Sequence, residues 1–119
     1  IRQPRPAPGR EVLASLELAD GEALFTSGDY ERNFSFEGRR YHHILDPRTG
    51  YPADQSQSAT VIARDPELAD AASTALFIAG PERAATLMER MGIDTWLLID
   101  AAGRQHASAA MRPRLNGPT

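Results

Sequence analysis

The sequence contains no cysteine and no lysine, and each absence limits the chemistry that the protein can perform. Without cysteine there is no disulfide, thiolate metal ligand or thiol nucleophile. All thirteen basic residues are arginine, which excludes Schiff-base chemistry and a lysine general base. Oxygen atoms and imidazole rings remain as the groups that can bind a metal or transfer a proton.

Long hydrophobic runs and a strong net charge are missing as well. No stretch approaches the roughly 20 apolar residues of a membrane-spanning helix. A formal charge of -3 gives no electrostatic reason to expect nucleic acid or an anionic membrane as a partner. The 119 residues are 41% hydrophobic, which is typical of one soluble globular domain.

The two ends of the chain have the composition of connecting segments. Residues 1–10 are rich in proline and predict a linker that connects to a missing upstream part of the protein. Residues 111–119 contain proline, glycine and asparagine and predict a flexible tail. The folded part is therefore expected over residues 11–110.

The first half of the folded part predicts two β-hairpins. In both, short apolar runs alternate with polar residues and are separated by turn residues. The strands are expected over 11–18 and 23–26, then over 33–36 and 40–45. Between the hairpins, Ser27–Asp29 predict a loop or a bulge.

The second half predicts a strand, two consecutive helices and two more strands. Asp65 as N-cap and Pro66 at the first helical position mark the start of a helix that ends before Gly80. The expected ranges are 58–64 for the first strand, 66–79 and 82–91 for the helices, and 95–100 followed by an edge strand for the rest. This order predicts an α+β domain with an antiparallel or mixed sheet.

Asp70 and Thr74 are the best candidates for a metal site. They stand one helical turn apart, so their side chains lie on the same face of the helix. A carboxylate with a hydroxyl suits Mg²⁺, which takes further ligands from water and phosphates. Ser73 adds a third oxygen, although an exposed helical serine is usually solvated surface. Taken alone, the pattern favours a simpler interpretation, in which Asp70 interacts with the helix dipole and Thr74 bonds a backbone carbonyl.

His43 and Arg48 lie at a constrained loop over 46–52. His43 lies near the end of the predicted strand 40–45, where its imidazole could act as a general base near neutral pH. Strand alternation puts His42 on the opposite face. A partly buried histidine that bonds a neighbouring loop is the favoured alternative. Arg48 could bind phosphate, but pairing with Asp46 within the loop is favoured for it.

Taken in order along the chain, four segments resemble the ApbE family of FAD:protein FMN transferases. The family pattern is a serine-glycine-aspartate loop, a histidine-isoleucine-aliphatic-aspartate-proline-arginine-threonine-glycine segment, and an alanine-aspartate-alanine helix with a threonine four residues after the aspartate. The matching segments are Thr26–Tyr30, Tyr41–Pro52, Ala69–Phe77 and Gly80–Glu82. The resemblance covers most of residues 11–103 and implies the C-terminal portion of an ApbE-like, T-fold-like domain.

The resemblance also implies a reaction and a set of site residues. Enzymes of this family depend on magnesium, cleave the diphosphate of FAD, attach FMN to a threonine or serine hydroxyl of an acceptor protein, and release AMP. By similarity, Asp70 and Thr74 would be Mg²⁺ ligands, and Ser73 stands where some members place another oxygen ligand. Ile44 would contact FAD, and His43 would help to remove the proton of the incoming hydroxyl.

Partners and a location follow from the same resemblance. Members are commonly exported to the periplasm and lipid-anchored at the inner membrane, and their acceptors are flavoprotein subunits of electron-transfer or ion-pumping complexes. Because members are much longer, the missing N-terminal half is expected as a partner, and this fragment is expected to be incomplete and inactive alone. Two alternatives stay open, namely a non-catalytic flavin- or metal-binding module and a structural or oligomerisation domain.

Overall fold

The elements follow the predicted order of strands, two helices and strands. The computed structural model describes residues 1, 16–28, 34–36, 39–41 and 55–115. Its elements are β1 (Ala23–Gly28), β2 (Phe34–Phe36), β3 (Arg39–Tyr41), β4 (Ser56–Ala63), α1 (Pro66–Ala79), α2 (Ala84–Arg90), β5 (Thr95–Asp100), β6 (Gln105–Ala107) and the 3₁₀ helix η1 (Arg112–Arg114). The α+β class is confirmed.

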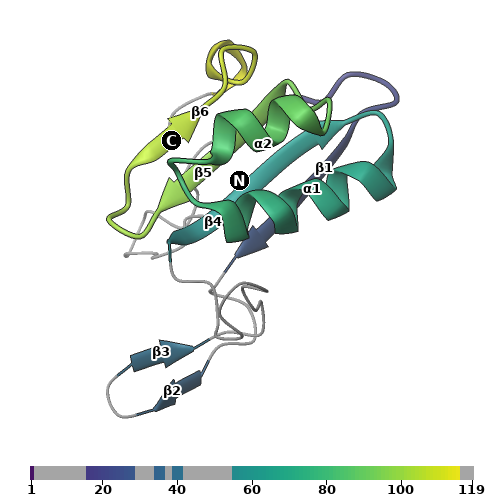
Figure 1. Cartoon of the computed structure of the whole chain (residues 1–119). Helices are drawn as coiled ribbons and strands as arrows, with labels where there is room; N and C mark the ends of the chain where they lie inside the picture. The colour runs from purple at the N-terminus through teal and green to yellow at the C-terminus, as the bar shows by residue number, and fades with distance from the viewer. Residues whose placement is uncertain (2–15, 29–33, 37–38, 42–54, 116–119) are drawn as a thin grey trace.

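One sheet organises these elements. Its four strands lie in the order β1-β4-β5-β6, and each neighbouring pair is antiparallel. The two helices connect β4 to β5 and lie together on one face of the sheet (Figure 1). Strands β2 and β3 pair with each other as a separate antiparallel hairpin, which confirms the second predicted hairpin over these strands. Residues 33 and 42–45 of the predicted hairpin lie outside the described residues. Of the two alternatives for the main sheet, the structure therefore selects the antiparallel one.

Helix α1 begins and ends at the residues that the sequence indicates. The carboxylate of Asp65 accepts hydrogen bonds from the backbone N–H groups of Glu67 and Leu68, at 3.0 and 3.4 Å, and Pro66 occupies the first turn. Gly80 closes the helix with a φ of 79°, and its N–H donates to the carbonyl of Leu76. Because β4 leads directly into this capped start, α1 folds back over the sheet.

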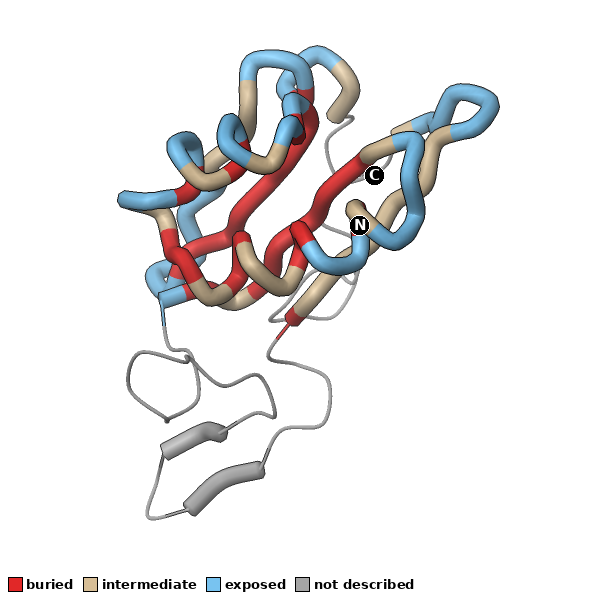
Figure 2. Tube along the Cα trace, turned by 45° about the vertical axis from the view of Figure 1, so that its right-hand side comes forward, coloured by how far each residue is buried: buried red, intermediate tan, exposed pale blue. Residues whose placement is uncertain are grey.

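The sheet has a buried core on each face. The helix-side core lies between the sheet and the two helices, and Figure 2 shows buried positions along β4, β5 and the inner faces of the helices. It consists of Ala59, Val61, Ala69, Ala72, Leu76, Phe77, Ala84, Met88, Ile93, Trp96 and Leu98. Such burial is the main favourable contribution to folding. In the described ranges, no helix has both the length and the apolar character needed to cross a membrane.

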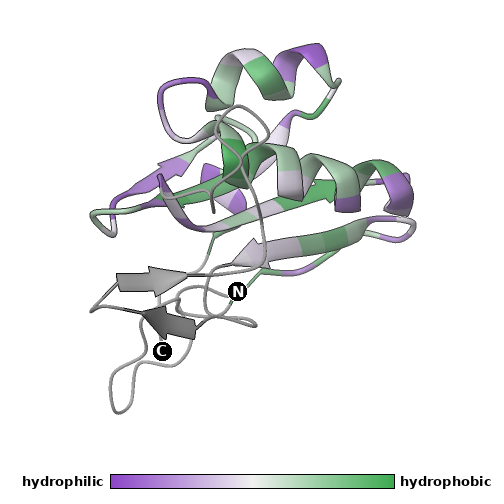
Figure 3. Ribbon diagram, turned by 60° about the horizontal axis from the view of Figure 1, so that its bottom comes forward, coloured by the Kyte–Doolittle hydropathy of each residue, from purple (hydrophilic) through white to green (hydrophobic). Residues whose placement is uncertain are grey.

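The opposite-face core is formed without a helix pair. Its buried members are Ile62, Leu97, Ile99 and Met111, and half-buried Ile1, Leu16, Leu24, Ala107 and Leu115 pack against them. Figure 3 shows the apolar character of the strands that separate the two cores. Met111 is fully buried and η1 follows it, so residues 111–115 pack on the sheet instead of forming the first part of a flexible tail. Residues 116–119 lie outside the described residues.

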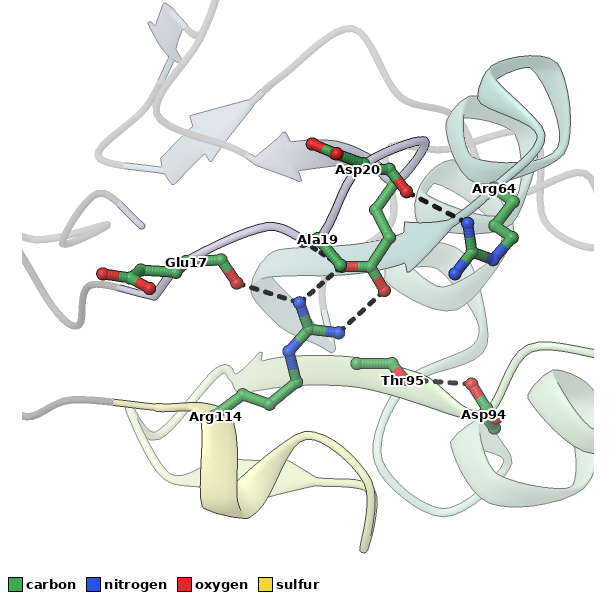
Figure 4. Close-up of polar contacts among 8 residues, drawn as sticks. Glu17, Ala19, Asp20, Arg64, Asp94, Thr95 and Arg114 are labelled. Carbon is green, nitrogen blue, oxygen red and sulfur yellow. Dashed lines mark hydrogen bonds and ion pairs between the residues drawn. The ribbon is translucent and has the colours of Figure 1, made fainter.

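The first predicted hairpin differs from the structure. Residues 19–22 do form a turn, in which the N–H of Glu22 donates to the carbonyl of Ala19 at 3.1 Å. However, residues 16–18 form no strand, and β1 pairs with β4 instead. The carbonyl of Glu17 accepts a hydrogen bond from the side chain of Arg114 in η1, instead of one from the backbone of a neighbouring strand (Figure 4). Residues 11–15 of that expected strand lie outside the described residues.

Candidate functional site

Asp70 and Thr74 lie one turn apart on α1, as the helical spacing predicts. Asp70 is exposed and Thr74 is half-buried. No hydrogen bond joins the Asp70 carboxylate to another residue within the described part of the chain. The hydroxyl of Thr74 lies 3.5 Å from the backbone carbonyl of Asp70, which is the outer limit of a hydrogen bond. The helix therefore offers one carboxylate without a described partner and one weakly bonded hydroxyl.

The end of β1 approaches this part of α1. Ser27 and Gly28 continue the strand and pair with Ala59 and Ser58, where a loop or bulge was predicted. Within β1, side chains alternate between the two faces of the sheet, so Ser27 points toward the helices and Thr26 points away. The Ser27 hydroxyl lies 3.0 Å from that of Ser73 and 3.3 Å from that of Thr74. The structure thus brings together two of the sequence segments that carry the family resemblance.

Ser73 is buried, with an exposed fraction of 1%, which corrects the expectation that it is a solvated surface residue. Its hydroxyl donates to the carbonyl of Asp70 at 2.9 Å, in addition to its contact with Ser27. The expectation failed because it treated the helix in isolation. Strand β1 packs beside α1 and covers the face on which Ser73 lies.

The oxygen atoms of Asp70 and Thr74 fit the requirements of a hard divalent cation. Mg²⁺ prefers oxygen ligands and is usually held by one or two carboxylates together with waters and substrate phosphates. Among the described residues, no group of three or more histidine, cysteine, aspartate or glutamate side chains could hold a metal ion. The described donor set is therefore too small for an all-protein cage, but it suits a cation that is shared with a phosphate ligand.

Three other candidates fall outside the described residues. His43, Ile44 and Arg48 all belong to the segment 42–54, so the structure does not place them relative to Asp70. Their roles stay predictions.

A polar pair outside the site involves His106 in β6. Its Nε2 lies 2.8 Å from the carboxylate of Asp100, and the backbone N–H groups of Ala102 and Arg104 also donate to that carboxylate. The hydrogen bond from His106 and then the one from the Arg104 N–H hold the pKa of Asp100 below its ordinary value. All four residues belong to the turn between β5 and β6 or to its flanks, so the pair fixes this turn.

Ser27 is the site residue that sequence reasoning missed. It was assigned to a turn because serine, glycine and aspartate follow one another there. A usable signal was present nevertheless. The alternation of Leu24, Thr26 and Gly28 with Phe25 and Ser27 places Ser27 on the face of Phe25, which packs against the helix-side core.

Comparisons with known proteins agree with the motifs. A model of the ApbE family matches residues 1–97. The FAD:protein FMN transferase of Rhodobacter capsulatus is 42% identical over 104 residues, which cover 87% of this chain and 20% of that protein. The FAD:protein FMN transferase of Treponema pallidum is 41% identical over 117 residues, which cover 97% of this chain and 32% of that protein.

A solved structure extends the similarity to the fold. The ApbE protein of Thermotoga maritima matches with a TM-score of 0.83 and 40% identity, over 97% of this chain and 37% of that chain. The present chain spans about a fifth to a third of the length of the two transferases described above.

Proposed function

The chain belongs to the ApbE family, and from this membership we propose that it is part of a magnesium-dependent FAD:protein FMN transferase. The similar proteins of Rhodobacter capsulatus and Treponema pallidum carry the name FAD:protein FMN transferase. The observation that carries the proposal is the placement of an exposed carboxylate, Asp70, on the same helix face as the Thr74 hydroxyl, beside the end of β1. Both groups are ligands that Mg²⁺ accepts.

The proposed reaction transfers FMN to a hydroxyl of an acceptor protein. The oxygen of a threonine or serine attacks the phosphorus on the FMN side of the FAD diphosphate, and a new phosphoester bond forms. The bond between that phosphorus and the bridging oxygen breaks, and AMP leaves with the bridging oxygen. A divalent cation at this site would supply neutralisation of the negative charge on the diphosphate and on the departing AMP.

The residues of this chain have distinct roles in the proposal. Asp70 and Thr74 bind the cation through oxygen, with Ser73 beside them, and His43 accepts the proton that the attacking hydroxyl loses. Ile44 contacts the flavin nucleotide. The roles of His43 and Ile44 rest on the family motif, whereas those of Asp70 and Thr74 also rest on the geometry of α1.

We propose that other parts of the complete protein finish the site. The described residues supply two candidate ligands, which are too few for a site that excludes water, and the similar transferases are several times longer than this chain. By itself the fragment would therefore be inactive. Its acceptor would be a flavoprotein subunit of an electron-transfer or ion-pumping complex, and the family resemblance supports a lipid-anchored periplasmic protein.

Replacement of Asp70 tests the proposal. In the complete gene product, we expect Asp70→Ala to lower the rate of Mg²⁺-dependent FMN transfer at least about 100-fold, because one of few charge-neutralising groups is lost. The measurement is the covalent flavin fluorescence of the acceptor over time. Glu67→Ala is the matched control, since Glu67 is an exposed carboxylate in the first turn of the same helix. Unchanged transfer by Asp70→Ala would refute the ligand assignment.

A structural module is the second candidate, and one observation favours it. Ser27, Ser73 and Thr74 already bond one another and the backbone, as they would in a helix that merely packs on a strand. Mg²⁺ titration of the complete gene product, with the melting temperature as the readout, separates the two candidates. A cation that binds the folded state raises the melting temperature, whereas a structural module shows no shift.

A further inference from the structure

Three hydroxyl groups form a continuous chain of contacts between β1 and α1. Ser27 comes from the strand, and Ser73 and Thr74 come from the helix. The contacts are 3.0 Å between Ser27 and Ser73, 3.3 Å between Ser27 and Thr74, and 2.9 Å from Ser73 to the carbonyl of Asp70. A fourth and longest contact, of 3.5 Å, joins Thr74 to the same carbonyl. The Ser27–Ser73–Thr74 group is called the hydroxyl chain below.

The positions of the protons in the hydroxyl chain follow from simple counting. Each hydroxyl has a single proton, and the carbonyl of Asp70 can only accept. Ser73 therefore donates to that carbonyl, its shortest contact. Ser27 must then donate to Ser73, because the Ser73 proton is already used.

The contact between Ser27 and Thr74 needs the last proton. Since Ser27 has given its own to Ser73, Thr74 must donate to Ser27 at 3.3 Å. In this arrangement the three shorter contacts each contain a proton, and only the contact of 3.5 Å lacks one. Shorter contacts are the stronger hydrogen bonds, so this arrangement is favoured over one in which Thr74 donates to the carbonyl.

We propose that Ser27 is a positioning residue that accepts the Thr74 proton and so directs the lone pairs of Thr74 Oγ1 toward the cation. This inference rests on the proposed function, because it concerns the same site. A hydroxyl binds a cation through its lone pairs, so its proton must be donated elsewhere. Ser27 provides a rigid acceptor, because its strand is held by the ladder to β4.

The same counting assigns a different role to Ser73. Its proton goes to the Asp70 carbonyl, one lone pair receives the Ser27 proton, and its exposed fraction is 1%. In the proposal, Ser73 thus relays the hydrogen bonding between the strand and the backbone of Asp70 in place of a role as cation ligand. The hydroxyl chain ties both candidate ligands, Asp70 and Thr74, to one strand.

The test measures Mg²⁺ binding apart from catalysis. In the complete gene product with saturating FAD, Mg²⁺ is titrated and the melting temperature is followed. The midpoint is the Mg²⁺ concentration at which half of the melting-temperature shift is reached. We expect Ser27→Ala to raise this midpoint about 10-fold, as is usual when a group that orients a metal ligand is removed. Thr26→Ala is the matched control, because Thr26 bonds Thr60 at 2.9 Å on the other face of the same strand. It should keep the wild-type midpoint.

A double variant distinguishes the relay from a ligand role for Ser73. If the hydroxyl chain acts as one unit, either single change interrupts it, and Ser27→Ala with Ser73→Ala should shift the midpoint no further than one change alone. If the double variant instead raises the midpoint by the product of the two single-variant factors, the relay is wrong. Should Ser27→Ala unfold, Ser27→Cys keeps a side chain of similar size with a weaker hydrogen-bonding group and is expected to shift the midpoint in the same direction.

Asp70→Ala separates this inference from the proposed function. A wild-type midpoint for Ser27→Ala, together with loss of the Mg²⁺ shift in Asp70→Ala, would overturn the positioning role alone. If Asp70→Ala keeps the full Mg²⁺ shift, the cation site itself is wrong and the proposed function fails with it.

Discussion

At the scale of single residues, an ion pair holds two distant segments of the chain together. Arg114 in η1 donates to both carboxylate oxygens of Glu22, at 2.6 and 3.0 Å, and also to the carbonyl of Glu17. Both charged side chains are mostly covered, with exposed fractions of 25% for Arg114 and 15% for Glu22. The two-point geometry gives this pair more specificity than an ordinary surface ion pair has.

The Glu22–Arg114 pair predicts a dependence of stability on pH. The hydrogen bonds from Arg114 and from the N–H of Ala19 lower the pKa of Glu22 from its usual 4.5 to about 2. A group with a lowered pKa in the folded state stabilises it fully above the unfolded pKa, and this contribution is lost as the pH falls toward the folded value. Stability from Glu22 should therefore be complete above about pH 4.5 and decline toward pH about 2.

Two glutamine variants test this prediction. Glu22→Gln should melt at a lower temperature than wild type near neutral pH, and the difference should shrink as the pH falls below about 4.5, where wild type begins to lose the contribution. Glu17→Gln is the control, because only the backbone carbonyl of Glu17 contacts Arg114. A difference between Glu22→Gln and wild type that stays constant over this pH range would contradict the lowered pKa.

At the scale of the elements, the end of α1 depends on one glycine. Gly80 has a φ of 79° and a ψ of 176°, a backbone conformation that is essentially restricted to glycine. A Cβ atom at this position would also lie 2.9 Å from the Cβ of Gln55, which precedes β4. Gly80 therefore lets the chain leave α1 next to the residue that precedes β4.

Replacement of this glycine should be costly. We expect Gly80→Ala to lower the free energy of unfolding by about 3 kcal/mol, since both the backbone conformation and the contact with Gln55 oppose a side chain. Gly92→Ala should cost only about 1 kcal/mol, because Gly92 also has a positive φ but a Cβ there would meet no atom within 4 Å. Urea denaturation of both variants gives the comparison. Equal losses would contradict the additional cost expected from the Gly80 backbone conformation and the contact with Gln55.

At the scale of the whole molecule, the sheet is stable because both of its faces are covered. Helices α1 and α2 cover one face, and the segment around Met111 together with Leu16 covers the other. Strands β4 and β5 lie in the middle of the sheet, and every residue of β5 is buried. A sheet that is covered on both faces needs apolar residues on both, which agrees with the nearly continuous apolar run in β5.

Truncation of Met111 tests whether the C-terminal segment belongs to the fold. We expect Met111→Ala to lower the free energy of unfolding by about 3 kcal/mol, because a fully buried side chain leaves a cavity in the opposite-face core. The next residue provides the control. Arg112 is exposed, so Arg112→Ala should change stability by less than about 0.5 kcal/mol. A flexible segment would instead give two small and similar effects in denaturation experiments.

Much of the fold was accessible from local sequence signals. The cap at Asp65, the proline after it and the glycines after each helix act within a few residues, so the bounds of α1 and the end of α2 could be predicted. Strand partners were harder. The turn at 19–22 suggested a hairpin, but the pairing of β1 with β4 joins residues that are 30 to 40 positions apart, beyond the reach of local signals.

The sequence by itself determined the composition of the candidate site: it placed Asp70 and Thr74 on one helix face and supplied the motifs of the ApbE family. Only the tertiary structure decided that Ser73 is buried and that Ser27 bonds to both helix hydroxyls. The physical reason is that helical periodicity is a property of consecutive residues, whereas a hydrogen bond between a strand and a helix exists only after the sheet has brought them together.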